Sequence, residues 1–477
     1  MSTSSNFNHW DSRLMVSIQK QYDVAIVGAG ICGTAAAYLL SQYTNVESII
    51  LLEKYDDVAQ VNSRVFNNSQ TLHFGDIETN YTLAKARRVN RAASLTKQYL
   101  LKYDPRQEIY SKYHKMVLAV GEEQTSILAK RYQEFKSLFP QLKLIDRAAI
   151  EAVEPNILQG RDADVKVSAL FTEEGYAVDF QKLAKSFLEK ASETPQTRVK
   201  FHSGMHVKQL TKLAAGYRID TDQQTFTAKT VVVAAGAHSL LFAKSLGYGR
   251  DYALLSVAGS FYRSKSALNG KVYTLQSKKL PFAAIHGDPE VHDRTVTRFG
   301  PTAKVLPQLE RHRSSTIIDY FKTAGLSLAA FLSFAAILLD FTIFRYILRN
   351  LLYDLPFIGK RLFIHQVRRI VPSMQLKDLQ YAKGYGGIRP QIVNIKTRKL
   401  QLGEAKILGD RIIFNITPSP GASTCLQNAE EDVEQIVQFL GDDYCFDKLR
   451  FWQDLGVEAE ATEDSNSSKV ESMPATA

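Results

Sequence analysis

Residues 23–53, DVAIVGAGICGTAAAYLLSQYTNVESIILLE, decide the fold of this chain. The short apolar run over residues 24–27 has the length and continuity of a buried parallel strand. A G-x-G-x-x-G turn follows, then a helical stretch over residues 34–40, and a second apolar run over residues 49–52 that ends at Glu53. This order predicts a β-α-β unit of the kind that binds a dinucleotide.

The three glycines and the carboxylate each have a physical role in such a unit. Gly28 permits the tight turn, Gly30 lets the backbone approach a pyrophosphate, and Gly33 lets helix and strand pack closely. The N-terminus of the helix faces the phosphate charge. Glu53 is placed to accept hydrogen bonds from ribose hydroxyls. These residues predict FAD or NAD without distinguishing between them.

Composition and charge exclude several classes of protein. With 477 residues, 45% of them hydrophobic and 23% charged, the chain is long enough for two or more lobes of an ordinary globular enzyme. Its three cysteines lie far apart without C-x-x-C spacing, so we expect neither a disulfide framework nor a metal site. The net charge of +10 suits an anionic substrate or membrane surface. The sequence contains no basic helix with interleaved aromatic residues, so we do not expect nucleic-acid binding.

Both ends of the chain are expected to lie outside the folded part. Residues 1–21 have no apolar core of signal-peptide type and read as a flexible tail. From about Val457 the chain is a polar run of Glu, Ser, Thr and Ala, and we expect residues 450–477 to form a disordered tail.

Three later stretches are placed to contact a cofactor. The segment 67–73, NNSQTLH, is a polar loop just after the first β-α-β unit. The segment 229–236, KTVVVAAG, is an apolar strand ending in small residues, which let a backbone lie beside a cofactor. The segment 412–426, IIFNITPSPGASTCL, predicts a strand, a turn and the N-terminus of a helix. Backbone N–H groups near Ser423 and Thr424 are then available to an electron-rich cofactor atom.

Residues 252–300 alternate short strands with turns, as expected for an antiparallel substrate lobe. His286 stands at a strand end in this region, and Arg298 precedes a Gly-Pro-Thr turn that fixes its direction.

The segment 324–344 is unusually apolar. Sixteen uncharged residues, 324–339, are followed by Asp340 and then by a basic region. A membrane span needs about 20 apolar residues. Three interpretations remain open: a buried or subunit-facing helix, a helix lying in the membrane interface, and a true span.

Several separated motifs together resemble the malate:quinone oxidoreductases, in the shorter form that is also similar to the 2-hydroxyglutarate and D-amino-acid oxidase superfamily. The resemblance covers about residues 22–449. Its motifs, in chain order, are VGAGICG, NNSQTLHFGDIETNYT, AGSFY, GKVYT, LPFAAIHGDP, GPTA, GIRPQ and NITPSPGASTCLQNA.

The resemblance implies an α/β protein with an FAD domain of the two-dinucleotide-binding (Rossmann-like) type and an interleaved antiparallel-sheet substrate domain. We expect the FAD domain over residues 22–100, 145–245 and 380–449, and the substrate domain over 101–144 and 246–379. The resemblance also implies the residues that contact FAD, which are Gly28, Gly30, Gly33, Glu53, Asn68, Ser69, Val207, Gly236, Ser419, Gly421, Ser423 and Thr424.

The implied reaction is oxidation of (S)-malate to oxaloacetate, with a hydride passed to FAD and electrons passed on to a membrane quinone. A general base is needed for the hydroxyl proton, and histidine suits that role. His286 is the first candidate and His73 the second. Arg389 and Arg298 are the candidate anchors for the two carboxylates, because arginine binds a planar carboxylate bidentately. A quinone acceptor implies a peripheral enzyme on the cytoplasmic side of the inner membrane.

Three alternatives stay open. An FAD-dependent oxidase of 2-hydroxyglutarate, or of another 2-hydroxyacid, is the nearest, since one methylene separates substrates by only about 1–3 kcal/mol. A nicotinamide dehydrogenase does not require the late NITPSPGAS stretch. A flavoprotein without catalytic activity, or a membrane scaffold, would bind FAD that no hydroxyacid reduces.

Overall fold

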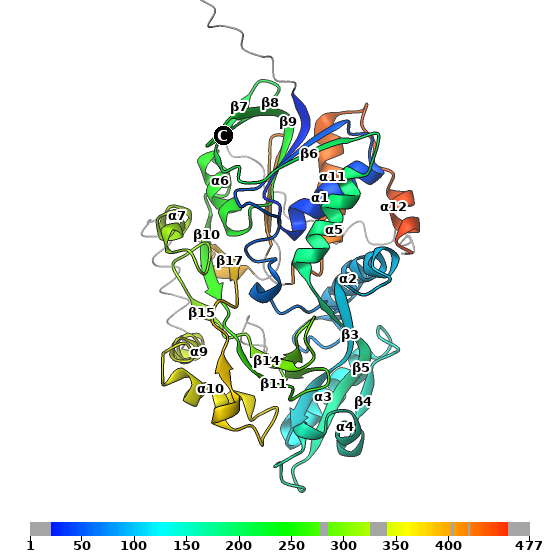
Figure 1. The fold of residues 1–477 in the computed structure, drawn as a ribbon, viewed down its shortest axis with the longest axis vertical. Helices are drawn as coiled ribbons and strands as arrows, with labels where there is room; N and C mark the ends of the chain where they lie inside the picture. The colour runs from blue at the N-terminus through cyan, green and yellow to red at the C-terminus, as the bar shows by residue number, and fades with distance from the viewer. Residues whose placement is uncertain (1–20, 277–284, 325–340, 402–404, 418–419, 457–477) are drawn as a thin grey trace, which may run out of the picture.

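The computed structural model describes residues 21–276, 285–324, 341–401, 405–417 and 420–456. These residues form two lobes that lie one above the other along the long axis of the molecule (Figure 1). Each lobe is built on an eight-stranded sheet, and a four-stranded sheet completes the structure.

The first lobe contains the predicted dinucleotide-binding unit. Its central strands are parallel, in the order β6-β2-β1-β9-β20, with β19 antiparallel at the edge and the β7–β8 hairpin pairing with β9. The strands are β1 (Tyr22–Val27), β2 (Ser48–Leu52), β6 (Arg198–His202), β7 (Val207–Leu213), β8 (Gly216–Thr221), β9 (Thr225–Val233), β19 (Ala405–Gly409) and β20 (Ile412–Ile416).

Both faces of this sheet are covered, which explains the continuous apolar runs of its central strands. Val24 and Ile26 pack on one face with the helices, whereas Ala25 and Val27 pack on the other with the β7–β8 hairpin. The helices on the first face are α1 (Ile31–Tyr43), α5 (Phe180–Ser192), α11 (Cys425–Leu440) and α12 (Lys448–Asp454), and α6 (Ser239–Ser245) lies on the second.

The second lobe is a sheet in the order β16-β11-β14-β13-β12-β3-β5-β4, antiparallel except where β12 runs parallel to β3. This confirms the predicted second sheet. Its strands are β3 (Tyr110–Val120), β4 (Lys143–Ile145), β5 (Val167–Val178), β11 (Tyr262–Lys265), β12 (Lys271–Thr274), β13 (His286–Pro289), β14 (Val296–Gly300) and β16 (Gln380–Tyr381). Helices α3 (Glu122–Phe135), α4 (Arg147–Val153) and α10 (Gly359–Val367) belong to this lobe (Figure 1).

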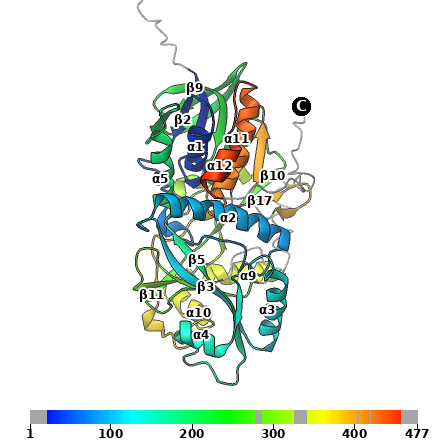
Figure 2. The same cartoon turned by 90° about the vertical axis from the view of Figure 1, so that its right-hand side faces the viewer.

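A four-stranded sheet, in the order β15-β10-β17-β18, joins the lobes. Its strands are β10 (Tyr252–Ala258), β15 (Lys304–Val305), β17 (Ile388–Asn394) and β18 (Lys399–Gln401). Helices α7 (Ile317–Ala324) and α9 (Phe341–Leu352) contact this sheet through β10 and β15. On another side of the molecule, α2 (Leu83–Tyr103) crosses between the lobes (Figure 2).

Two details differ from the sequence expectation. Strand β5 belongs to the second sheet, because it pairs along most of its length with β3, whereas residues 145–245 were assigned to the FAD domain. Helix α12 extends into the range expected to be disordered, because Phe451 is fully buried against Tyr43.

The apolar segment predicted over residues 324–344 falls mostly outside the described residues, and so do residues 1–20 and 457–477, which make up most of the expected tails 1–21 and 450–477. Among the residues that are described, no helix combines the length and apolar character needed to cross a bilayer.

Candidate functional site

A cavity of about 680 Å³ opens at the carboxyl ends of β1 and β9 and extends to the strand β17. Nine of the predicted cofactor residues line it: Gly28, Gly30, Glu53, Asn68, Ser69, Val207, Gly236, Gly421 and Ser423. Thr424 is buried directly after Ser423, at the start of α11, and Ser419 lies outside the described residues.

The glycine turn has the geometry that a pyrophosphate site requires. Gly28 has φ +103°, and a Cβ there would lie 2.6 Å from the carbonyl oxygen of Ala234. A Cβ on Gly33 would lie 1.9 Å from the carbonyl oxygen of Gly28, so this glycine serves close packing. Gly30 differs, because its nearest neighbour would be Ser63 Oγ at 3.5 Å, which leaves open cavity beside it.

The first turn of α1 is available to an anion. Gly30 precedes the helix and supplies no side-chain cap, and Ser63 Oγ accepts only the N–H of Ile31, at 3.1 Å. Because unpaired N–H groups at a helix N-terminus favour negative charge, the turn fits the pyrophosphate of a dinucleotide.

Glu53 is held in place by the backbone. Its Oε2 accepts the N–H of Ala29 at 2.8 Å, and its Oε1 accepts the N–H of Tyr55 at 3.0 Å. Burial raises the pKa of Glu53, although these two hydrogen bonds act in the opposite direction. Each oxygen keeps a further lone pair, which suits the ribose contact predicted from the sequence.

The polar loop after residue 61 lies along the cavity, but its side chains mostly hold the loop itself. Asn68 Nδ2 donates to the carbonyl oxygens of Asn62 (3.1 Å) and Arg64 (2.9 Å). Asn68 Oδ1 accepts the N–H of Gln70 at 2.9 Å. The side-chain amide of Asn68 is therefore engaged within the loop itself.

His73 lines the cavity and is oriented by a buried carboxylate. Its Nδ1 lies 2.5 Å from Glu78 Oε1, and its backbone N–H donates to Ser423 Oγ at 3.0 Å. Burial raises the pKa of Glu78, but the hydrogen bond and the charge of His73, with the charge of Lys115, outweigh burial and lower it. An ionised Glu78 accepts the Nδ1–H of His73, so Nε2 is the ring nitrogen that is left for a ligand.

His286, the first candidate for the base, does not line the cavity. Its ring is buried, stacks on Tyr273 with centroids 4.5 Å apart, and has Nε2 3.4 Å from Asp288 Oδ1. The Tyr273 hydroxyl in turn lies 2.9 Å from Oγ1 of Thr71, which does line the cavity.

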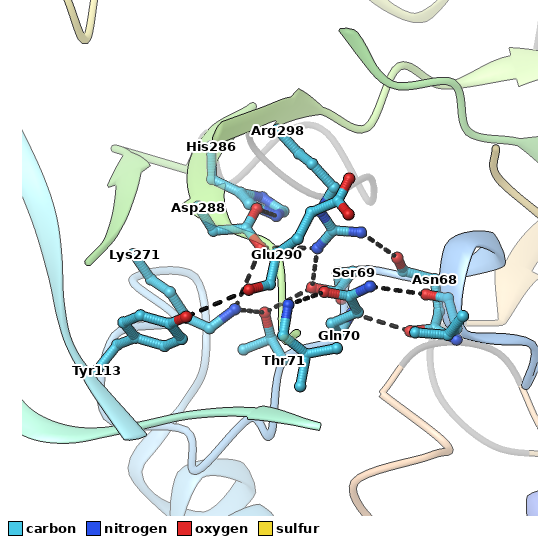
Figure 3. A network of polar contacts seen from close by, with 12 residues as sticks. Asn68, Ser69, Gln70, Thr71, Tyr113, Lys271, His286, Asp288, Glu290 and Arg298 are labelled. Carbon is cyan, nitrogen blue, oxygen red and sulfur yellow. Dashed lines mark hydrogen bonds and ion pairs between the residues drawn. The ribbon is translucent and has the colours of Figure 1, made fainter. Parts of the chain in front are cut away.

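Arg298 likewise lies behind the cavity wall, in the network drawn in Figure 3. Its guanidinium is fully buried and donates to the carbonyl oxygens of Asn68 (3.3 Å) and Ser69 (3.1 Å) and to Asp288 Oδ2 (2.7 Å). Lys271 Nζ joins the same carboxylate oxygen at 3.2 Å. Burial raises the pKa of Asp288, but the charges of Arg298 and Lys271 lower it to about 2.

Arg389 does line the cavity, from the strand β17. It is half-buried, and among the described residues no hydrogen bond or ion pair engages its guanidinium. Burial lowers the pKa of Arg389, while the phenol of Tyr346 acts against this shift. A half-buried guanidinium without a protein anion is suited to bind the carboxylate of a ligand.

Three residues of this region had no role assigned from the sequence. Glu78 stands in the NNSQTLHFGDIETNYT motif, five positions after His73, and Asp288 and Lys271 stand in the HGDP and GKVYT motifs. Their presence in motifs was a usable signal. No signal in the sequence indicated their partners, because Lys271, Asp288 and Arg298 come together only through the pairing of β13 with β12 and with β14.

Comparison with known proteins places the chain in a family. The family model described as malate:quinone oxidoreductase matches residues 20–439. The chain belongs to the malate:quinone oxidoreductase family. Membership confirms the predicted class of enzyme, an oxidoreductase, and with the dinucleotide-binding site it confirms FAD as the cofactor.

Two curated relatives match over nearly their whole length. A Campylobacter jejuni protein, named "Probable malate:quinone oxidoreductase", is 42% identical over 90% of this chain and 98% of its own. The malate:quinone oxidoreductase of Helicobacter pylori is 39% identical over 92% of this chain and 98% of its own.

Solved structures share the fold. Glycine oxidase from Geobacillus kaustophilus has a TM-score of 0.61 at 15% identity, over 88% of this chain and 95% of that one. The L-alpha-glycerophosphate oxidase of Mycoplasma pneumoniae, solved with FAD bound, has a TM-score of 0.61 at 17% identity, over 87% and 95%. These likenesses confirm the predicted fold class.

Proposed function

We propose that this protein oxidises (S)-malate to oxaloacetate and that its electrons pass through FAD to a quinone in the membrane. The observation that carries the proposal is that Arg389 and His73, whose ring is held by Glu78, line the same cavity as the glycine turn. The printed names of the Campylobacter and Helicobacter relatives support malate and quinone as the two substrates.

Bound FAD supplies an acceptor for the hydride that leaves the hydroxyl-bearing carbon. The residues of the chain supply the remainder. Arg389 binds a carboxylate of the substrate, which fixes the orientation of the neighbouring carbon. The His73 ring, held by Glu78, takes the hydroxyl proton at Nε2. The positive charge that forms on the ring is stabilised by the Glu78 carboxylate, as in other His–carboxylate pairs.

The choice of His73 over His286 rests on access. A general base must come within hydrogen-bond reach of the proton that it removes. His73 lines the cavity, whereas His286 is buried behind Thr71 and Tyr273. His286 remains the alternative, and the comparison of His73→Asn with His286→Asn decides between them.

Arg298 was one of the two expected carboxylate anchors, and we propose a positioning role for it instead. Its Nη1 and Nη2 atoms are engaged by Asn68, Ser69 and Asp288. It therefore acts on the cavity through the loop that it holds.

A quinone acceptor requires contact with a bilayer, so we further propose that the protein is peripheral to the cytoplasmic side of the inner membrane. The net charge of +10 favours an anionic membrane surface.

The decisive experiment is anaerobic titration of the FAD-loaded protein with L-malate and, separately, with L-2-hydroxyglutarate. We expect malate to bleach the absorbance band of the oxidised flavin at about 450 nm. If 2-hydroxyglutarate alone bleaches the flavin, it replaces malate as the proposed substrate, and the assignment of the cofactor site is unchanged. A flavin that neither acid reduces would overturn the proposed reaction.

A further inference from the structure

Helix α9 has its apolar side on the outside of the molecule. Phe341, Phe344, Leu348 and Leu351 recur at the spacing of one helical face, and each is exposed by 45% or more. The opposite face is partly polar, because Asn350 is buried and its Oδ1 accepts the N–H of Ala303 at 2.9 Å. A soluble helix normally has the reverse arrangement, so the outer face of α9 is suited to a covering layer.

The apolar surface continues into the turn between α9 and α10. Leu355 is 41% exposed, Phe357 is 92% exposed and Ile358 is 52% exposed. Of the sixteen large apolar side chains that are exposed among the described residues, nine lie between Ile318 and Ile358. We call the surface formed by residues 341, 344, 348, 351, 355, 357 and 358 the α9 surface. Helices α9 and α10 lie together at one edge of the molecule (Figure 1).

The charges around this surface have one sign. Residues 341–369 contain six basic residues and one acidic residue, Asp354. That carboxylate is 7% exposed and pairs with Lys304, so it does not offset the basic side chains outside. The basic residues are Arg345, Arg349, Lys360, Arg361, Arg368 and Arg369.

We propose that the α9 surface enters the outer layer of an anionic phospholipid bilayer, with the neighbouring arginines on the lipid phosphates. Apolar side chains flanked by basic residues are the pattern of an interfacial membrane element. The proposal rests on the proposed function, because a quinone acceptor requires a bilayer. It assigns the contact to described residues rather than to the apolar segment 325–340.

A second copy of the chain fits this surface less well. A two-fold interface repeats the same patch on both partners, so Arg345 and Arg349 would approach their own copies. Like charges facing each other weaken such an interface. Lipid phosphates provide the opposite charge.

The inner face of α9 connects the α9 surface to the candidate site. Tyr346 packs against the cluster that contains Val257, and Val257 is paired with Arg389 across β10 and β17. Directly paired residues of neighbouring strands point to the same face of a sheet, so the Arg389 side chain lies on the same face as Val257 and Tyr346. This places the lipid side near the substrate end of the cavity.

The test is sedimentation of the full-length, FAD-loaded protein with vesicles. Vesicles of equal parts phosphatidylcholine and phosphatidylglycerol are compared with pure phosphatidylcholine. The triple variant Leu348→Ser, Leu351→Ser, Phe357→Ser removes apolar contacts without opening the core, because all three side chains are exposed. The matched control, Leu83→Ser, Ile127→Ser, Leu144→Ser, removes exposed apolar side chains from other elements.

We expect the wild-type protein and the control to bind the anionic vesicles, and the triple variant to bind them more weakly by on the order of tenfold or more. Binding should also weaken in pure phosphatidylcholine and at high salt. Equal binding by the triple variant and the control would overturn the proposal. A dimer in lipid-free buffer that the triple variant dissociates would assign the α9 surface to self-association instead.

A direct readout of insertion is the variant Phe357→Trp. Its tryptophan emission should shift to the blue when anionic vesicles are added, whereas that of Leu144→Trp should not. Malate-dependent flavin bleaching in lipid-free buffer tests the proposed function separately. A protein that binds vesicles through the α9 surface but is not bleached by malate would contradict the function and leave the surface assignment standing.

Discussion

Asp288 and Arg298 lie directly opposite each other on β13 and β14, with Asp288 Oδ2 2.7 Å from Arg298 Nη2 and neither side chain exposed. Arg298 also donates to the carbonyl oxygens of Asn68 and Ser69, in the loop that lines the cavity (Figure 3). The ion pair therefore fixes the position of a cavity-lining loop that comes from a distant part of the chain.

Removing the Asp288 carboxylate should destabilise the protein strongly. The variant Asp288→Asn leaves the buried cations of Arg298 and Lys271 without their anion, and breaking a buried pair costs about 3–5 kcal/mol. We expect a large fall in the urea midpoint. The control Glu193→Gln, which removes an exposed partner of Lys190, should change stability by about 0.5 kcal/mol or less. Similar midpoints for the two variants would contradict the structural role of Asp288.

The Asp288–Arg298 pair should also make the stability of the folded protein depend on pH in the acid range. The pKa of Asp288 is about 2 when folded, below its usual value of 3.8. The unfolded chain therefore takes up the proton first, so the stabilisation is complete above about pH 4 and is lost as the pH falls towards 2. Between about pH 5 and pH 3, the stability difference between wild type and Asp288→Asn should narrow by about 1 kcal/mol. Urea unfolding at several pH values measures it, and a difference that stays constant would refute the lowered pKa.

Two glycines of the same motif should respond differently to alanine. In Gly33→Ala the new Cβ would collide with the carbonyl oxygen of Gly28, so we expect loss of folded protein. In Gly30→Ala the Cβ has room beside Ser63 but enters the cavity, so the fold should persist while FAD affinity falls. Flavin absorbance and the melting curve of the apoprotein separate the two effects. A Gly30→Ala protein with full FAD content would contradict the placement of the pyrophosphate.

The sequence predicted the parts of the fold that depend on neighbouring residues. The unit β1–α1–β2 was predictable because its apolar runs, glycine turn and Glu53 lie within residues 23–53. The position of Arg298 was not, because its partners Asn68 and Ser69 are about 230 positions away in the chain. In the sequence both Arg298 and Arg389 stand beside turns. Only the pairing of their strands puts Arg298 behind the cavity wall and Arg389 in the cavity lining.

The His73–Glu78 pair should control the rate of flavin reduction. A positioned general base contributes roughly 10²–10⁴ in rate, so His73→Asn should slow anaerobic reduction by malate to that extent while FAD stays bound. Glu78→Gln should slow it less, because the ring remains but loses the charge that orients it. Stopped-flow absorbance measures each rate. If His286→Asn has the larger effect with full FAD content, the base is His286.

Arg389 should determine malate binding rather than cofactor binding. Arg389 lines the cavity and its guanidinium has no anionic partner among the described residues, so the substrate carboxylate is the group that we expect to neutralise it. Hydrogen bonds to charged groups contribute about 1.5–3 kcal/mol, so Arg389→Met should raise KM by on the order of a hundredfold. Arg389→Lys keeps the charge but loses the bidentate geometry, so it should recover part of this loss. The control Arg250→Met removes an exposed arginine and should leave KM unchanged. Steady-state kinetics with a soluble electron acceptor measures all three variants. A normal KM in Arg389→Met, with FAD bound, would remove Arg389 from the substrate site.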